Sequence, residues 1–86
     1  MNIYVGNLDY KIDSQDLEGI FEEYGTISSA KVIMDRFSGK SKGFGFVEMD
    51  NQDEATNAIK ELNGATLENR KMVVNEARPK KDNFNS

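Results

Sequence analysis

The chain of 86 residues contains no cysteine and no histidine. Without cysteine there can be no disulfide framework, thiol nucleophile or cysteine-ligated metal centre. The absence of histidine removes the most common general base and metal ligand. No apolar run approaches the roughly 20 residues of a membrane-spanning helix, and the amino terminus lacks the pattern of a signal peptide. We therefore expect no enzyme, cofactor or metal site, and a cytoplasmic location.

Basic residues are also few, since 11 lysines and arginines face 15 acids for a formal charge of −4. The two signs are separated along the chain. Residues 13–23 hold five acids and no base, and residues 50–61 hold four acids and one base. Bases instead gather in residues 36–42 and 70–81. A molecule with this distribution can hold a phosphate chain on one face, although more weakly than a uniformly basic protein.

Aromatic residues are concentrated in the segment KGFGFVEM, residues 42–49. Because strand side chains alternate between faces, Phe44 and Phe46 project the same way, with Glu48 beside them. Val47 projects the other way, toward a core. Neighbouring phenyl rings are costly to leave in water. They are favoured on an open face if a nucleobase stacks on them.

A second alternating segment is IYVGNL, residues 3–8. Its apolar residues Ile3 and Val5 share one face, and Tyr4 and Gly6 share the other. If this strand pairs with the aromatic strand, Tyr4 joins the two phenyl rings on one surface. Gly6 would then leave room for a ligand to approach the backbone.

These segments resemble the two signatures of the RNA-recognition-motif family. The octamer matches the family pattern at seven of eight positions. Met49 departs at the last position, where it would fill core volume. The two signatures occur in the family order, and the resemblance covers about residues 1–79. The chain is most similar to small stand-alone bacterial members of the family, which implies a role in post-transcriptional regulation or RNA chaperoning.

Helical spacing of apolar residues predicts two helices. The first covers residues 14–24, with Asp13 as its cap and Asp16 as the reciprocal partner. The second covers residues 53–62. Strands are predicted over residues 2–7, 27–35, 42–49 and 72–77. In the second strand we expect the side chains at alternate positions to face the core, namely Ala30, Val32 and Met34.

The resulting order is β-α-β-β-α-β. With right-handed crossovers it predicts an α+β, ferredoxin-like sandwich, in which a four-stranded antiparallel sheet carries both helices on one face. The two signature strands become the central pair. We assign residues 1–79 to this domain and residues 80–86 to a disordered polar tail.

The resemblance implies binding of single-stranded RNA on the open sheet face. Tyr4 and Phe46 would each stack a base, Phe44 would pack against sugars or between nucleotides, and Lys42 would pair with a phosphate. The remaining expected contacts lie at the end of the last strand, at the end of the first strand and on the open face, namely Asn75, Glu76, Ala77, Arg78, Asn7, Lys31 and Glu48.

Two residues depart from the family pattern in loops. Phe37 stands where the family usually has a polar residue; it could stack on an extra base, but we expect it to pack on a neighbour. Asn69 stands in a small turn, predicted over residues 67–70, where the family often has glycine. Asparagine tolerates the left-handed conformation, so we expect the turn to be kept.

Three alternatives stay open. Single-stranded DNA is one, because stacking does not distinguish the sugars. A basic protein docking on the acidic helix face is another. An acylphosphatase-like hydrolase is disfavoured, because residues 7–11 contain an acid and no glycine-rich phosphate cradle. We expect the chain to be a monomer.

Overall fold

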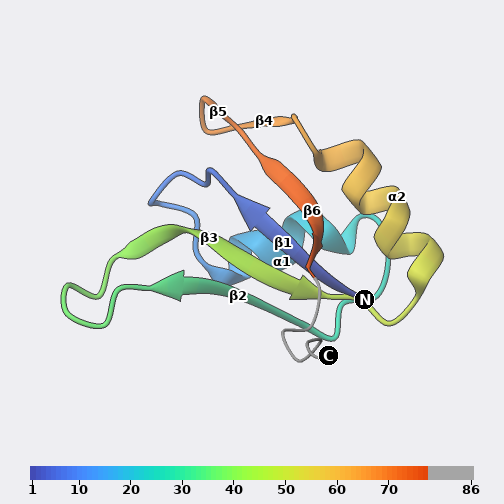
Figure 1. The fold of residues 1–86 in the computed structure, drawn as a ribbon, viewed down its shortest axis with the longest axis horizontal. Coiled ribbons are helices and arrows are strands. Elements are labelled where there is room, and N and C mark those ends of the chain that lie inside the picture. The colour runs from blue at the N-terminus through green and yellow to red at the C-terminus, as the bar shows by residue number, and fades with distance from the viewer. Residues whose placement is uncertain (78–86) are drawn as a thin grey trace, which may run out of the picture.

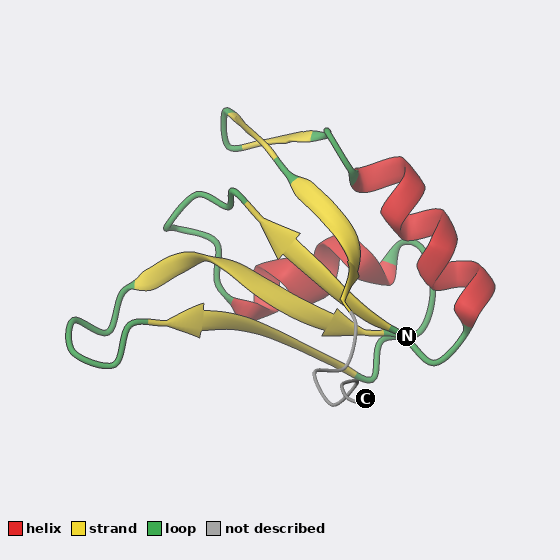
Figure 2. Cartoon of the chain, viewed as in Figure 1, coloured by secondary structure: helices red, strands yellow, loops and turns green. Residues whose placement is uncertain are grey.

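The computed structural model describes residues 1–77, so Arg78 and the expected tail over 80–86 lie outside the described residues. The elements follow one another as β1 (Asn2–Gly6), α1 (Ser14–Glu22), β2 (Ser29–Met34), β3 (Ser41–Glu48), α2 (Gln52–Leu62), β4 (Thr66–Leu67), β5 (Arg70–Lys71) and β6 (Val73–Ala77) (Figure 1). The predicted β-α-β-β-α-β order is confirmed. The small turn expected over residues 67–70 is the short β4–β5 hairpin (Figure 2).

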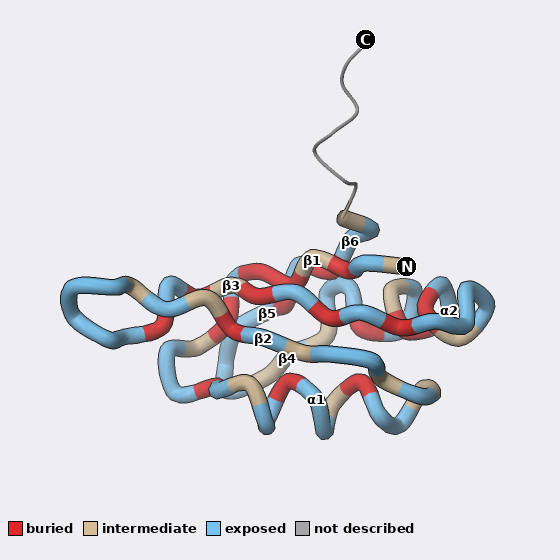
Figure 3. Tube along the Cα trace, turned by 90° about the horizontal axis from the view of Figure 1, so that it is seen from below, coloured by how far each residue is buried: buried red, intermediate tan, exposed pale blue. Residues whose placement is uncertain are grey.

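The main sheet is antiparallel and has the strand order β2-β3-β1-β6. The two strands with the aromatic signatures, β1 and β3, are therefore its central pair, as predicted. Helix α1 lies beneath the sheet in Figure 3, and within residues 1–77 no helix covers the opposite face. Neither helix of this part of the chain is long and apolar enough to cross a membrane.

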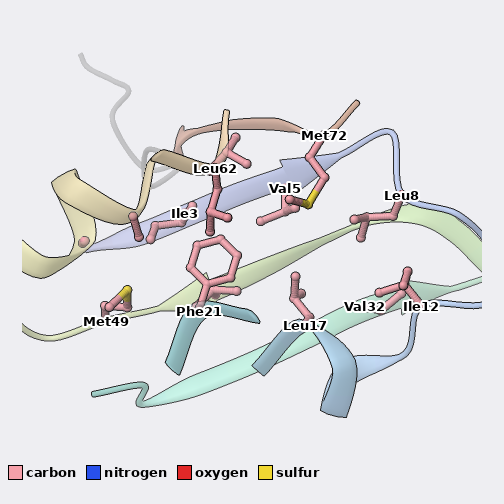
Figure 4. Packing of buried hydrophobic residues seen from close by; sticks show 14 residues of the cluster. Ile3, Val5, Leu8, Ile12, Leu17, Phe21, Val32, Met49, Leu62 and Met72 are labelled. Atoms are coloured by element: carbon pink, nitrogen blue, oxygen red, sulfur yellow. The ribbon is translucent and has the colours of Figure 1, made fainter. Parts of the chain in front are cut away.

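The core lies between the sheet and the helices (Figure 4). Ile3 and Val5 of β1 and Leu17 and Phe21 of α1 have no exposed surface. Burying each such side chain contributes about 1.5–3 kcal/mol. Met49 is also fully buried, which confirms that methionine fills core volume at the last position of the octamer.

Both helices begin at side-chain caps. The Asp13 carboxylate accepts from the Asp16 N–H at 2.9 Å, and the Asp16 carboxylate accepts from the Asp13 N–H at 3.2 Å, so the predicted capping box is confirmed. Helix α2 begins one residue earlier than predicted, because Asn51 caps it by accepting from the Glu54 N–H at 2.9 Å.

A bulge interrupts the pairing of β2 with β3. Val32 pairs with Gly45, but Met34 pairs with Ser41, so residues 42–44 of β3 lie opposite the single residue 33 of β2. The expectation that Met34 faces the core is wrong, because the side chain is 51% exposed. Met34 is the last residue of β2 and leads into the exposed connection to β3, so alternation along the strand does not bury it.

The β4–β5 turn depends on two residues with positive φ. Glu68 has φ +53° and Asn69 has φ +70°. A two-residue hairpin turn of this kind needs positive φ at both central positions. The prediction that Asn69 keeps the turn is confirmed.

Candidate nucleic-acid interface

Three aromatic rings lie together on the helix-free face of the sheet, and we call Tyr4, Phe44 and Phe46 the aromatic platform. Their ring centroids are 5.9–6.1 Å apart. The ring planes are inclined by 32°, 63° and 89°, so two of the three contacts are edge-to-face. Such aromatic pairs contribute about 0.5–1.5 kcal/mol beyond their area burial. The rings therefore hold one another in place without a ligand.

Exposure differs within the platform. Phe46 is 39% exposed, whereas Tyr4 and Phe44 are partly buried by their neighbours. A large apolar side chain with this exposure in the middle of a sheet has surface left for a flat ligand.

Strand register extends the platform into a line across the whole sheet. Phe46 pairs with Lys31 on one side and with Tyr4 on the other, and Tyr4 pairs in turn with Asn75. Side chains directly opposite each other on antiparallel strands lie about 4.5–5.5 Å apart at Cβ. An ammonium, two aromatic rings and an amide thus follow one another across four strands.

A second line lies two residues further along the same face. Glu48 pairs with Ser29 and with Asn2, and Asn2 pairs with Ala77. Because side chains two positions apart share a face, Glu48 and Ala77 lie beside the first line. Register therefore gathers most of the predicted site residues on one surface.

Two of the predicted site residues are placed differently. Glu76 pairs with Ile3, whose side chain is fully buried toward the helices, so Glu76 belongs to the opposite face of the sheet. Asn7 has φ +57° and its amide is engaged within the protein. Its Nδ2 donates to the Lys71 carbonyl at 2.7 Å, and its Oδ1 accepts from Arg70 Nη1 at 3.0 Å.

The space above Gly6 is occupied by the platform itself. A methyl group at Gly6 would lie 2.8 Å from Cζ of Tyr4. The expectation that Gly6 leaves room for a ligand is wrong, because the Tyr4 ring lies over it. Gly6 instead allows that ring to lie flat along its own strand.

Gly45 lies between the two phenylalanines but faces the neighbouring strand. A methyl group there would lie 2.9 Å from the Val32 Cα and would also meet the Lys31 carbonyl oxygen. The glycine therefore allows β3 to approach the backbone of β2.

Sequence reasoning missed a cation–aromatic contact at the end of the sheet. The guanidinium carbon of Arg70 lies 5.9 Å from the ring centroid of Tyr10, which is 68% exposed. Val73, two positions from Asn75 on β6, is 42% exposed. The basic pair at residues 70–71 was the available signal, but its place beside Tyr10 depends on the β4–β5 hairpin.

The connection from β2 to β3 is basic and ordered. The Asp35 carboxylate accepts from the Phe37 N–H at 2.7 Å and from the Ser38 N–H at 3.2 Å. These two hydrogen bonds, with the nearby Lys42 ammonium, hold the pKa of Asp35 below its usual value of 3.8. Phe37 is 95% exposed, so the expectation that it packs on a neighbour is wrong.

Comparison with known proteins shows which family the chain is similar to. The model of the family described as RNA recognition motif matches residues 3–73. A candidate RNA-binding protein of Nostoc sp., RbpB, is 44% identical over 82 residues, which make up 95% of this chain and 80% of that protein. The chloroplast RNA-binding protein CP29B of Arabidopsis thaliana is 52% identical over 75 residues, 87% of this chain. The chain spans only 26% of the length of CP29B.

Solved structures show the same fold. The crystal structure of RNA binding protein PG1 matches with a TM-score of 0.88 and 50% identity, covering 93% of this chain and 99% of that one. A complex of the Sex-lethal protein with RNA matches with a TM-score of 0.86 and 32% identity, covering 91% of this chain and 47% of that one.

Proposed function

Since this chain belongs to the RNA-recognition-motif family, we propose that it binds single-stranded RNA by stacking bases on the aromatic platform. The observation that supports this most directly is the cluster of three aromatic rings on a sheet face without a helix. RNA binding of this kind would serve post-transcriptional regulation or RNA chaperoning.

Phe44 and each member of the first line across the sheet have distinct proposed roles. Phe46, the most exposed ring, stacks one base, and Tyr4 stacks the next. Phe44 packs against a sugar or between nucleotides. The ammonium of Lys31 suits a phosphate, and the amide of Asn75 can both donate to and accept from a base edge.

The expected affinity is modest. Base stacking on an aromatic side chain contributes about 1–3 kcal/mol per base. Two or three such contacts must offset the ordering of a flexible strand, which predicts a Kd of about 1 μM for a segment of about four nucleotides. Neutralising about three phosphates would give a slope of log K against log salt near −2.

The test is a fluorescence anisotropy titration of a labelled tetranucleotide pool of degenerate sequence. The Tyr4→Ala/Phe46→Ala variant should bind at least tenfold more weakly than wild type, because two stacking surfaces are lost. The matched control is Tyr4→Phe/Phe46→Tyr, which keeps both rings and should bind within a few-fold of wild type. Equal binding by the alanine variant and wild type would reject the platform.

The same titration with single-stranded DNA of matched length tests whether the ribose contributes to binding. Base stacking does not depend on the sugar, so the platform alone would bind single-stranded RNA and single-stranded DNA alike. A preference for RNA would show that 2′-hydroxyl contacts contribute, whereas equal affinity would extend the ligand to single-stranded DNA.

A groove on the other side of the molecule favours a second candidate function, the docking of a basic protein segment. The groove has a volume of about 410 Å³ and runs between α1 and the β4–β5 hairpin. Three of its lining residues are acidic, Asp16, Glu23 and Glu68, against the single base Lys11. Titration of a lysine-rich peptide should shift the amide resonances of α1 in wild type, and should not shift them in an Asp16→Asn/Glu23→Gln variant.

We further propose that the chain acts as a monomeric binding module without catalytic activity, in the cytoplasm. The RNA-binding names of its relatives support a binding role, although CP29B carries a chloroplast designation. Sedimentation equilibrium at micromolar concentration checks the monomer, and imaging of the tagged protein in its own cell checks the compartment.

A further inference from the structure

Phe37 is the most exposed large apolar side chain of the described residues, at 95%. It lies in the connection between β2 and β3, which extends beyond the rest of the molecule at the left of Figure 1. Single exposed apolar side chains are common and do not by themselves indicate a ligand. Three further features of this connection distinguish Phe37 from such a case.

The first feature is order. Besides the two hydrogen bonds to its carboxylate, Asp35 donates its N–H to the Lys40 carbonyl at 2.7 Å and accepts from the Gly39 N–H at 2.8 Å. Gly39 has φ +73°, a conformation that glycine adopts without strain. The tip is thus held by four hydrogen bonds around one residue, so little backbone entropy remains to be lost when a ligand contacts Phe37.

The second feature is charge. Residues 35–42 hold three bases, Arg36, Lys40 and Lys42, against the single acid Asp35, for a local charge of +2 in a chain of −4. All three bases are exposed, whereas the Asp35 carboxylate is engaged by backbone N–H groups. An aromatic ring among cations suits a base that is flanked by phosphates.

The third feature is continuity with the aromatic platform. The connection leads directly into β3, which carries Lys42 and Phe44 on the platform side. Lys40 and Phe44 are four positions apart, a span of at most roughly 13 Å.

We propose that Phe37 is an additional stacking site for a base of the same RNA strand, beyond the segment that covers the platform. This inference rests on the proposed function, because it extends the platform along β3. A short RNA that fills the platform does not reach the tip, whereas a longer one does. The contribution of Phe37 therefore depends on RNA length.

The test compares wild type with Phe37→Ala on degenerate RNA pools of four and ten nucleotides. For the ten-nucleotide pool the variant should lose about 5- to 150-fold in affinity, the equivalent of one stacked base. For the four-nucleotide pool it should bind as wild type does. Phe37→Tyr, which keeps a ring, should retain the long-RNA affinity, and Phe37→Leu, which keeps only apolar volume, should lose most of it.

Other outcomes would overturn the inference. Equal affinity of wild type and Phe37→Ala for the ten-nucleotide pool, or an equal loss at both lengths, would reject the site. Self-association of wild type that Phe37→Ala abolishes would assign the residue to a contact between copies. In each case the proposed function still stands if the tetranucleotide affinity remains sensitive to Tyr4→Ala/Phe46→Ala. Because the ring is almost wholly in solvent, Phe37→Ala should keep the fold, and circular dichroism checks this.

Discussion

Gly6 and Gly45 lie on the two central strands, and a methyl group added at each of them would meet a different neighbour. The atoms nearest a methyl group at Gly6 belong to the Tyr4 ring, and those nearest a methyl group at Gly45 belong to the backbone of β2. A side chain can rotate away from a clash, whereas the backbone of a paired strand cannot. Gly6 therefore concerns the binding surface, whereas Gly45 concerns the pairing of β3 with β2.

Gly6→Ala should weaken RNA binding. The added methyl group would displace the Tyr4 ring from its place along β1, removing one stacking surface. The expected cost is about 1–3 kcal/mol of binding free energy, which a tetranucleotide titration measures. Urea unfolding should also show a loss of up to about 3 kcal/mol in the free energy of unfolding, because the displaced ring gives up its contacts with Phe44 and Phe46.

Gly45→Ala should destabilise the fold. The methyl group would lie 2.9 Å from the Val32 Cα and 3.1 Å from the Lys31 carbonyl carbon, so β2 and β3 would have to separate. Overpacking of this kind costs about 1–3 kcal/mol, which urea unfolding measures. A Gly45→Ala variant as stable as wild type would contradict the close approach of the two strands at Gly45.

At the scale of elements, the β2–β3 connection is held by an ionised carboxylate. Hydrogen bonds from Phe37 and Ser38 and the charge of Lys42 lower the pKa of Asp35 below 3.8. A lowered pKa means that the stabilisation is fully present above pH 3.8 and is lost as the pH falls through the pKa of the folded state. The amide resonances of Phe37 and Ser38 should therefore titrate with a midpoint below pH 3.8.

The same resonances should not titrate between pH 5 and 8, since the chain has no histidine. Asp35→Asn keeps an oxygen acceptor but has no charge to lose, so it is the matched control and should abolish the acid titration. A titration that persists in Asp35→Asn would show that another group controls the connection.

Local patterns predicted most of these elements and failed where distant residues decide the structure. Alternation at residues 42–49 and helical spacing at residues 14–24 are signals within one element, and both were sufficient. Met34 was expected to be buried, but it is the last residue of β2, and alternation does not say where along a strand the core ends. Arg70 in β5 contacts Tyr10, which is far away in sequence, so the basic pair at residues 70–71 indicates a cation but not its aromatic partner.

In the candidate site, too, local patterns predicted some features, and others depend on residues far away in sequence. Three aromatic rings could be placed on one face from alternation alone, once β1 and β3 were assumed to be neighbours. The position of the Tyr4 ring over Gly6 could not, because a side-chain rotamer depends on the packing around it. The exposure of Phe37 could not be predicted either, because the sequence does not indicate whether a loop side chain packs against another residue.

At the scale of the whole molecule, a protein of charge −4 must attract a polyanion through an uneven distribution of charge. The exposed acids Glu18 and Glu22 lie on α1, beneath the sheet, and the shortest dimension of the molecule is 21 Å. At about 20 Å in water, two unit charges interact by only about 0.2 kcal/mol. The acids of α1 therefore oppose RNA binding weakly and only at low ionic strength.

Charge substitutions on the two faces should consequently behave differently with salt. Glu18→Gln/Glu22→Gln should raise the affinity for a tetranucleotide by at most about fivefold at 10 mM salt, where the Debye length is about 30 Å, and should have no effect at 0.3 M. Lys31→Gln/Lys42→Gln should lower the affinity and make the slope of log K against log salt shallower by about 1.4, because two phosphate contacts are lost. A change of slope of the same size for the glutamate variant would show that the RNA also contacts the helix face.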